Sequence, residues 1–203
     1  MNSAALATED ILSESIAQRL FATHGLVASV LLRRQGRGYL YSRMKNWCEM
    51  ANNNQPLVLL TDLDSKPCAS VLIKEWLGRN SPPINLVLRV AVRDVESWLL
   101  ADHEGMQQLL GKAKNVHLPL DPDRLPDPKR YLLSLAGKAR RDVRDDLVET
   151  RGSSAIQGLG YNARLCSFVC TDWSIERASS RSDSLRRTRL RLSELATRLA
   201  HKA

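Results

Sequence analysis

The segment 57–65 (LVLLTDLDS) is an apolar run that stops at two aspartates, Asp62 and Asp64. Leucine and valine followed by acid predict a buried parallel strand, because such strands are covered on both faces and are apolar throughout. Ligands of open α/β sheets bind beyond the carboxyl ends of the strands, so both aspartates are expected to face a cleft. An aspartate after a strand can also form a turn or cap the next helix, and residues 65–67 look like a helix start.

Three further segments have strand character and alternate with segments of helical periodicity. The predicted strands are residues 4–8, 26–32, the segment from Leu57, and 86–92. Helical spacing of apolar residues occurs at 9–23, 40–50, 67–77 and 95–110. Strands that alternate with helices at short intervals predict βαβ units and a mainly parallel sheet. We therefore expect an α/β fold with about four strands flanked by helices.

The second part of the chain, residues 112–203, has a different composition. Four prolines between 112 and 128 prevent a continuous helix, and beyond them the chain reads as helices. Asp127 and Pro128 form a good N-cap and first-turn pair for the first of these helices. The glycine-rich stretch 152–162 lacks a phosphate-binding pattern and is expected to be a turn between helices. We predict an α/β core at 1–111 and, packed on it as a single compact unit, a helical C-terminal elaboration at 112–203.

Acidic and basic residues follow the ends of the predicted strands. Because parallel strands end at the same edge of a sheet, these residues are predicted to lie together. The carboxylates are Glu9, Asp62, Asp64 and Glu96. Oxygen ligands of this kind suit Mg²⁺ or Mn²⁺. The basic residues predicted to bind phosphate or nucleic acid are Arg33, Arg34, Arg37, Arg93 and Lys129.

Some of these residues also have simpler structural explanations. Asp10, next to Glu9, is better explained by the first turn of a helix, where the helix dipole favours acids. The loop 33–39 (RRQGRGY) is equally consistent with a plain connection, and Glu96 with a solvent-exposed helix face. Asp102 and His103 are expected to be a surface feature at the far end of their helix.

The composition favours an anionic partner. The 203 residues include 30 Lys and Arg against 22 Asp and Glu, a formal net charge of +8, so nucleic acid is expected before a membrane surface. The four cysteines show no CxxC pairing, which indicates free thiols rather than a zinc site or a disulfide framework. No apolar stretch has the length of a membrane span and the N-terminus lacks a signal-peptide pattern, so a cytoplasmic protein is expected.

Three segments together resemble the TOPRIM domain of topoisomerases, primases and nucleases of the overcoming-lysogenization-defect type. These segments are TEDILSE (8–14), LVLLTDLDS (57–65) and RVAVRDVESWLLAD (89–102). The chain looks most similar to small TOPRIM-like proteins that often sit beside ATPase genes in phage-defence loci. The resemblance covers roughly residues 4–111 and implies that Glu9 is a metal ligand or general acid/base. It further implies that Asp62 and Asp64 bind the metal and that Glu96 is an additional ligand.

The predicted function is a nuclease that uses Mg²⁺ or Mn²⁺ to hydrolyse DNA or RNA. The resemblance implies an ATPase partner and a role as the effector subunit of an antiviral defence complex, and it leaves a homo-oligomer open. The alternative is a non-catalytic TOPRIM-like scaffold that binds an ATPase or nucleic acid. Two other classes fit less well, because a response-regulator receiver needs a fifth strand ending in lysine and haloacid dehalogenase phosphatases carry DxD on the first strand.

Overall fold

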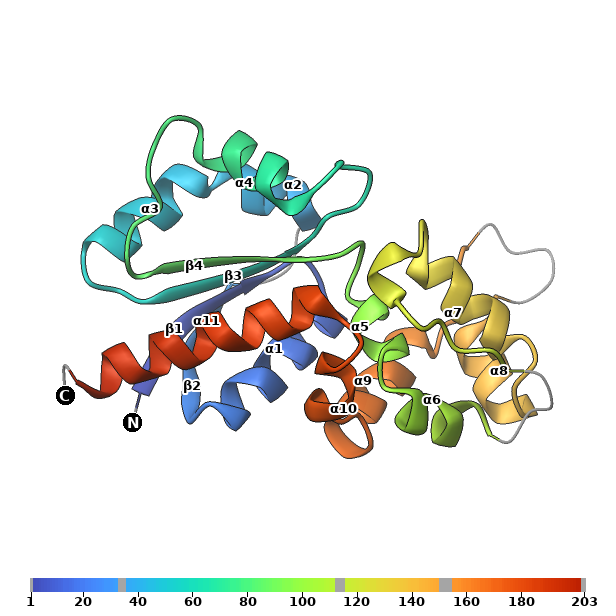
Figure 1. Cartoon of the computed structure of the whole chain (residues 1–203). Helices are drawn as coiled ribbons and strands as arrows, with labels where there is room; N and C mark the ends of the chain where they lie inside the picture. Colours follow the sequence, from blue (N-terminus) through green and yellow to red (C-terminus); the bar gives the residue numbers. More distant parts are fainter. Residues whose placement is uncertain (1, 33–35, 112–115, 150–154, 202–203) are drawn as a thin grey trace.

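The centre of the computed structural model, which describes residues 2–32, 36–111, 116–149 and 155–201, is a sheet of four parallel strands (Figure 1). The strands are β1 (Asn2–Thr8), β2 (Leu26–Leu32), β3 (Leu57–Asp62) and β4 (Leu86–Ala91). Their order is β2-β1-β3-β4, so β1 and β3 are central and β2 and β4 are the edges. The predicted α/β fold with a four-stranded parallel sheet is confirmed, and this architecture is consistent with a TOPRIM-like, Rossmann-type fold.

The two faces of the sheet belong to two apolar clusters, because successive side chains of a strand point to opposite faces. Ala4 and Leu6 of β1 pack in the larger cluster, and Ala5 and Ala7 pack in the smaller one. Helices α1 (Ile11–Thr23) and α11 (Asp183–Ala200) lie on the first face (Figure 1). Helices α2 (Gly36–Ser42), α3 (Met44–Asn52) and α4 (Ala69–Leu77) lie on the second. Both faces are thus covered, as the apolar strands require.

Two predicted helices are each divided in the structure. The helix expected over 40–50 consists of α2 and α3, which meet at Arg43. The helix expected over 95–110 consists of α5 (Glu96–Leu100) and α6 (His103–Leu110). The second break occurs because Asp102 leaves the helical conformation, with φ −87° and ψ 83°, and its side chain accepts a hydrogen bond from the backbone N–H of Gly105. Aspartate favours such a cap over a helix interior.

The described part of the C-terminal region is helical and packs on the sheet. It contains η1 (Pro122–Arg124), α7 (Pro128–Ala136), α8 (Arg141–Leu147), α9 (Tyr161–Thr171), α10 (Ile175–Ser179) and α11. Helix α9 packs along α1, and α11 crosses β4 and β1. Leu6 of β1 and Leu192 of α11 belong to the same apolar cluster, so the two parts of the chain share a core. The division at residue 111 stays a prediction.

The expected glycine turn lies between α8 and α9. The backbone N–H of Gly158 donates to the carbonyl oxygen of Leu147 at 2.9 Å. A Cβ atom on Gly158 would lie 2.3 Å from the carbonyl oxygen of Asp146, so no larger residue fits there without moving the backbone. The glycine therefore allows a close backbone approach, which is a structural role.

Two findings bear on the expected location and cysteine chemistry. Among the described residues, no helix combines the length and the apolar character that crossing a membrane would require. Cys48, Cys68, Cys166 and Cys170 are all free thiols, as predicted.

Candidate active site

Four carboxylates gather at the carboxyl edge of the sheet. Glu9 directly follows β1, and Asp62 is the last residue of β3. Asp94 and Glu96 follow β4, and Glu96 begins α5. Because β1, β3 and β4 are neighbours, the negative charges of the other three carboxylates all act on Asp62. Glu9, Asp62 and Glu96 are predicted site residues, and Asp94 is an addition from the structure.

Glu9 is held by the neighbouring strand β3. Its Oε1 accepts a hydrogen bond from the Thr61 hydroxyl group and another, of 2.9 Å, from the backbone N–H of Asp62. Burial raises the pKa of Glu9, and these two hydrogen bonds oppose the increase. The two bonds fix the carboxylate of Glu9 relative to Asp62.

Asp62 has a buried oxygen with no donor. Its Oδ1 atom accepts no hydrogen bond from the part of the chain that the structure describes. Burial raises the pKa of Asp62 well above its ordinary value, and the charges of Glu9, Glu96 and Asp94 raise it further. A buried carboxylate oxygen without a donor is costly unless a proton or a cation occupies it. This atom is therefore a position where a cation would be strongly stabilised.

Asp94 resembles Asp62 in its burial and in the direction of its pKa change. Its Oδ1 atom is also buried and finds no donor among the described residues. Burial, followed by the charge of Glu96, raises the pKa of Asp94 from 3.8 to about 8. The backbone N–H of Lys129 donates to the Asp94 side chain and partly opposes this effect. A carboxyl group with such a pKa exchanges its proton near neutral pH, which general acid–base chemistry requires.

Glu96 is enclosed by the C-terminal helices. It is only 5% exposed, and its Oε1 accepts a hydrogen bond of 2.6 Å from the Tyr161 hydroxyl group of α9. The alternative explanation of Glu96 as a solvent-exposed residue is therefore wrong, because α9 packs Tyr161 over it. Burial raises the pKa of Glu96, and the Tyr161 hydrogen bond and the nearby positive charge of Lys129 oppose the increase.

Lys129 lies in the first turn of α7, and its Nζ is 5.0 Å from the centroid of the Tyr161 ring. That helix begins as predicted, with Asp127 as N-cap accepting from the backbone N–H of Arg130 at 2.8 Å and Pro128 in the first turn. The cation therefore contacts the aromatic ring that holds Glu96. Its predicted phosphate contact stays a prediction.

Asp64 and the predicted arginines make contacts of their own. Asp64 has a positive φ of 49°, and its Oδ2 is 2.7 Å from Nη1 of Arg37. Arg93 donates through Nη1 to the carbonyl oxygens of Asp64 and Lys66, both at 2.9 Å. Asp64 does not cap α4, whose N-cap is Cys68. The structure thus keeps Asp64 beside the cluster, in an exposed ion pair.

Three residues from the sequence analysis remain, two of the predicted arginines and Asp10. Arg33 and Arg34 lie outside the described residues. Asp10 is the N-cap of α1 and accepts a hydrogen bond of 2.7 Å from the backbone N–H of Ser13. Its local structural explanation is therefore confirmed, although it caps the helix rather than lying in the first turn.

The chain matches no protein-family model, no curated protein and no solved structure. The chemistry of the edge therefore has to be inferred from its own residues. No three acidic, histidine or cysteine side chains within the described ranges are arranged as a preformed metal-binding group. The donors themselves suit Mg²⁺ or Mn²⁺, because all are carboxylate oxygens and two of them are buried with no hydrogen-bond partner in the described part of the chain.

A signal for Asp94 is present in the sequence. Strand β3 ends in Asp62-Leu63-Asp64, and β4 is followed by Asp94-Val95-Glu96. The same acid-x-acid spacing thus occurs after two adjacent strands. Comparison of the two strand ends would have predicted Asp94 as a site residue.

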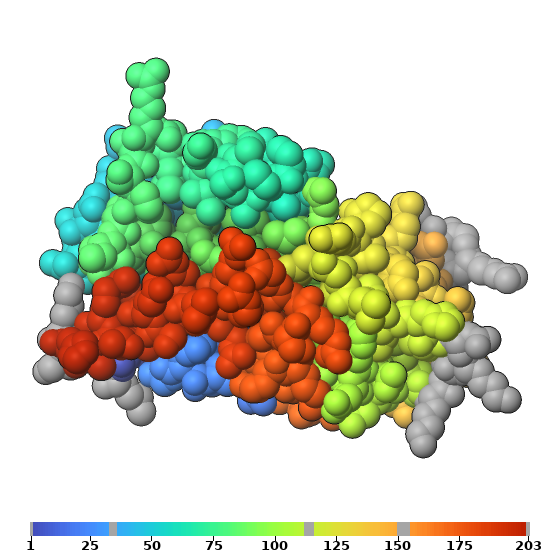
Figure 2. All heavy atoms as spheres, in the orientation of Figure 1, coloured from blue at the N-terminus to red at the C-terminus, as the bar shows by residue number. Residues whose placement is uncertain are grey.

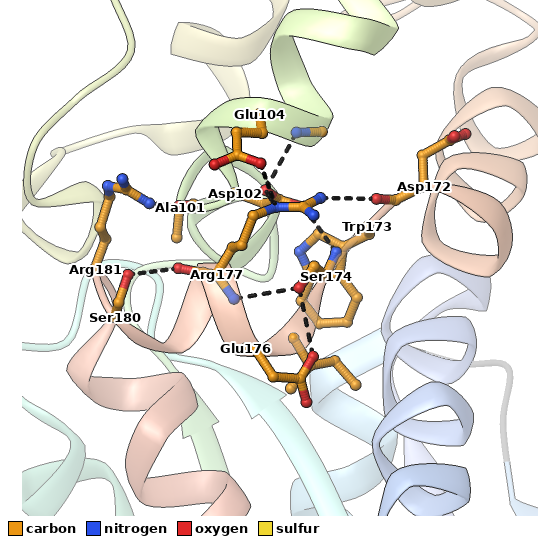
Figure 3. Close-up of polar contacts among 12 residues, drawn as sticks. Ala101, Asp102, Glu104, Asp172, Trp173, Ser174, Glu176, Arg177, Ser180 and Arg181 are labelled. Atoms are coloured by element: carbon orange, nitrogen blue, oxygen red, sulfur yellow. Dashed lines mark hydrogen bonds and ion pairs between the residues drawn. The ribbon is translucent and has the colours of Figure 1, made fainter.

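Another buried carboxylate, Asp102, lies away from this cluster at the junction of α5 and α6 (Figure 3). The Asp102 side chain is 0% exposed and forms an ion pair of 2.6 Å with Nε of Arg177. It also accepts hydrogen bonds from Nη2 of Arg177 and from the backbone N–H of Ser174, both at 2.7 Å. The expectation of a surface feature is wrong for Asp102, because α10 covers it. Half-buried His103 contacts the carbonyl oxygen of Pro119 through Nε2 at 2.9 Å.

Proposed function

We propose that this protein is a TOPRIM-like nuclease that uses Mg²⁺ or Mn²⁺ to hydrolyse phosphodiester bonds in DNA or RNA. The observation that carries the proposal is the convergence of four carboxylates from three adjacent strand ends. Two of these carboxylates have a buried oxygen that accepts no hydrogen bond from the described residues. Ordinary structural acids are paired or exposed. Buried like charges that are mutually destabilising are typical of functional sites, where a cation or proton compensates them.

Glu9, Asp62 and Asp94 are the residues that would hold a divalent ion. The bound ion would polarise the scissile phosphate and lower the pKa of a water molecule. Tyr161 keeps Glu96 in place through the bond to Oε1, so Glu96 can orient the ligands or the water. Without the ion, Asp94 has a pKa of about 8 and holds a proton at neutral pH, which a bound ion would displace.

Asp64 and Arg37 pair with each other in the structure, and under this proposal each would exchange that partner for a ligand. Their ion pair is exposed, with 51% of the Asp64 side chain accessible. Exposed pairs contribute at most about 1 kcal/mol, so exchange of partners would cost little. Asp64 would then reach the ion and Arg37 a phosphate oxygen of the substrate. An ATPase partner and a role in antiviral defence extend this proposal and rest on the TOPRIM resemblance.

The test combines cleavage with metal binding. Purified wild type, Asp62→Asn and the control Asp145→Asn are incubated with supercoiled plasmid DNA and with labelled single-stranded RNA, in Mg²⁺ or Mn²⁺. Asp145 is exposed on α8 and pairs with Arg141, so its variant preserves the sheet edge. Asp62→Asn is expected to lower the cleavage rate at least about 100-fold and to weaken Mn²⁺ binding in calorimetry, while Asp145→Asn changes neither.

The nuclease proposal is wrong when wild type cleaves neither substrate with either ion, or when cleavage survives in Asp62→Asn. The second candidate function is a non-catalytic scaffold. One observation favours it: Arg37 is paired with Asp64, and Arg93 is bonded to two backbone carbonyls, so both predicted phosphate ligands have internal partners. A scaffold would bind nucleic acid or an ATPase equally well before and after Asp62→Asn.

A further inference from the structure

Arg89 is a charged residue in the middle of an otherwise apolar strand. The sequence of β4 is LVLRVA, and Arg89 is its only half-buried residue. Its Nε donates to the hydroxyl group of Thr188 on α11 at 3.3 Å. Among the described residues, no carboxylate lies within ion-pair distance of Arg89. A partly buried guanidinium without an ion-pair partner is costly, and here only the more distant charge of Glu194 acts on it favourably.

Two further arginines increase the local positive charge. Arg187 and Arg191 are one turn apart on α11, and therefore on the same side of that helix. Burial lowers the pKa of Arg89, the charges of Arg191 and Arg187 lower it further, and the charge of Glu194 partly opposes this. Arg187 pairs with Asp183 at 2.5 Å and Arg191 with Glu194 at 2.7 Å.

These ion pairs are weak competitors for an incoming anion. The side chains of Arg187 and Arg191 are 67% and 60% exposed, and pairs of this kind contribute at most about 1 kcal/mol. Both arginines can therefore turn toward a ligand at small cost. Arg89 needs no such exchange, because its guanidinium has no carboxylate to leave.

Arg89, Arg187 and Arg191 line a groove along the open edge of β4, with a volume of about 830 Å³. Figure 2 shows its two walls on the surface, α4 (teal) on one side and α11 (red) on the other. Ile73 and Leu190 add apolar surface to these walls. The lining carboxylates are Asp121, Asp123, Asp183 and Glu194.

Three of those carboxylates are already paired with an arginine, Asp121 with Arg124 at 3.0 Å and the other two as described above. The fourth, Asp123, accepts bonds of 2.8 Å from the Ser182 hydroxyl group and from the backbone N–H of Ser184. Among the described residues that line the groove, Arg89 is thus the arginine without an ion-pair partner.

We propose that this groove binds the phosphate group of a nucleotide, with Arg89 as its principal ligand and Arg187 and Arg191 as secondary ligands. The planar guanidinium fork matches two phosphate oxygens at once. The apolar walls at Ile73 and Leu190 fit the sugar or the base. The phosphate belongs either to a free mononucleotide or to a nucleic acid strand. The site is distinct from the acidic cluster and does not depend on a metal ion.

The test measures binding in EDTA, so that metal chemistry plays no part. Fluorescence anisotropy with labelled dT12 and calorimetry with AMP are applied to wild type, Arg89→Gln and the control Arg141→Gln. Arg141 is 88% exposed on α8, away from the groove. Arg89→Gln is expected to weaken binding of at least one probe about tenfold or more. For dT12 the slope of log affinity against log salt should also fall by about one.

Each outcome either identifies the source of the phosphate or refutes the proposed site. Loss of dT12 affinity identifies a nucleic acid strand as the source of the phosphate, and loss of AMP affinity alone identifies a mononucleotide. The proposal is overturned when wild type binds neither probe, or when Arg89→Gln behaves like Arg141→Gln. Should Arg89→Gln fail to fold, the exposed Arg191→Gln must weaken binding about threefold, and unchanged affinity refutes the site. Asp62→Asn should bind both probes normally, so the nuclease proposal can fail independently.

Discussion

Removal of one partner from the ion pair of Asp102 with Arg177 should strongly destabilise the protein (Figure 3). The Asp102 carboxylate accepts four hydrogen bonds: two from Arg177, one from the N–H of Gly105 and one from the N–H of Ser174. Asp102→Asn replaces one acceptor oxygen with a donor, so an N–H group then faces another N–H group. It also leaves the guanidinium with only the exposed carboxylate of Glu104, at 3.7 Å, as a counter-ion. Breaking a buried pair from one side costs about 3–5 kcal/mol.

That loss corresponds to a decrease in the melting temperature of roughly 6–20 °C for a chain of this size. Urea unfolding followed by tryptophan fluorescence measures it directly. Buried Trp173 precedes Ser174, which donates to Asp102, and Nε1 of Trp173 donates to the carbonyl oxygen of Trp98 at 3.1 Å. Arg177→Met keeps the apolar stem and removes the charge. The double variant with Asp102→Asn should lose about 1–3 kcal/mol less than the sum of the two single variants.

Glu104→Gln is the matched control for this experiment. Glu104 contacts the same arginine, Arg177, at 3.7 Å, but its side chain is 72% exposed. Its removal should therefore cost less than about 1 kcal/mol. Equal losses for Asp102→Asn and Glu104→Gln would refute the argument that burial and the four hydrogen bonds determine the size of the effect.

Two further predictions concern the sheet edge and the glycine turn. The pKa of Asp94 is about 8, so between about pH 4 and 8 the folded protein retains a proton that the unfolded chain releases. Stability should therefore fall as pH rises through this window. Asp94→Asn should reduce the loss measured by urea titrations at pH 5 and 8.5, and the remaining loss comes from Asp62 and the other acids of raised pKa; parallel profiles would contradict this. Gly158→Ala should lower the free energy of unfolding by about 1–3 kcal/mol, because its Cβ would meet the carbonyl oxygen of Asp146 at 2.3 Å. An unchanged urea midpoint would show that this turn relaxes freely.

The strands and part of the site follow from local sequence. Apolar runs that are buried on both faces are recognisable without a partner, and the predicted bounds of β2, 26–32, match the structure. Parallel strands end at one edge, so Glu9, Asp62 and Glu96 could be grouped before any contact was known. The acid-x-acid repeat at Asp94 is local too, but after this strand only Arg93 and Glu96 were predicted as site residues.

The surroundings of these acids could not be predicted, because they depend on residues far along the chain. Glu96 is buried by Tyr161, which follows it by 65 positions. Asp102 is buried by Arg177, which follows it by 75. No periodicity within one segment carries such information. Burial of a polar residue depends on which helix packs against it. Local sequence patterns do not specify that partner.

The C-terminal helices therefore determine the electrostatics of the sheet edge. The N-terminus of α7 brings a backbone N–H to Asp94, and α9 covers Glu96 with Tyr161. This packing excludes water from carboxylates that already repel one another, so the protonated forms are favoured without a cation. Under the proposed function a divalent ion must displace those protons, so its affinity should increase with pH over the range in which the ion-free protein loses stability. The pH dependence of ion affinity and the pH dependence of stability have the same origin, the raised pKa values of these carboxyl groups. A variant that reduces one of these dependences should therefore reduce the other.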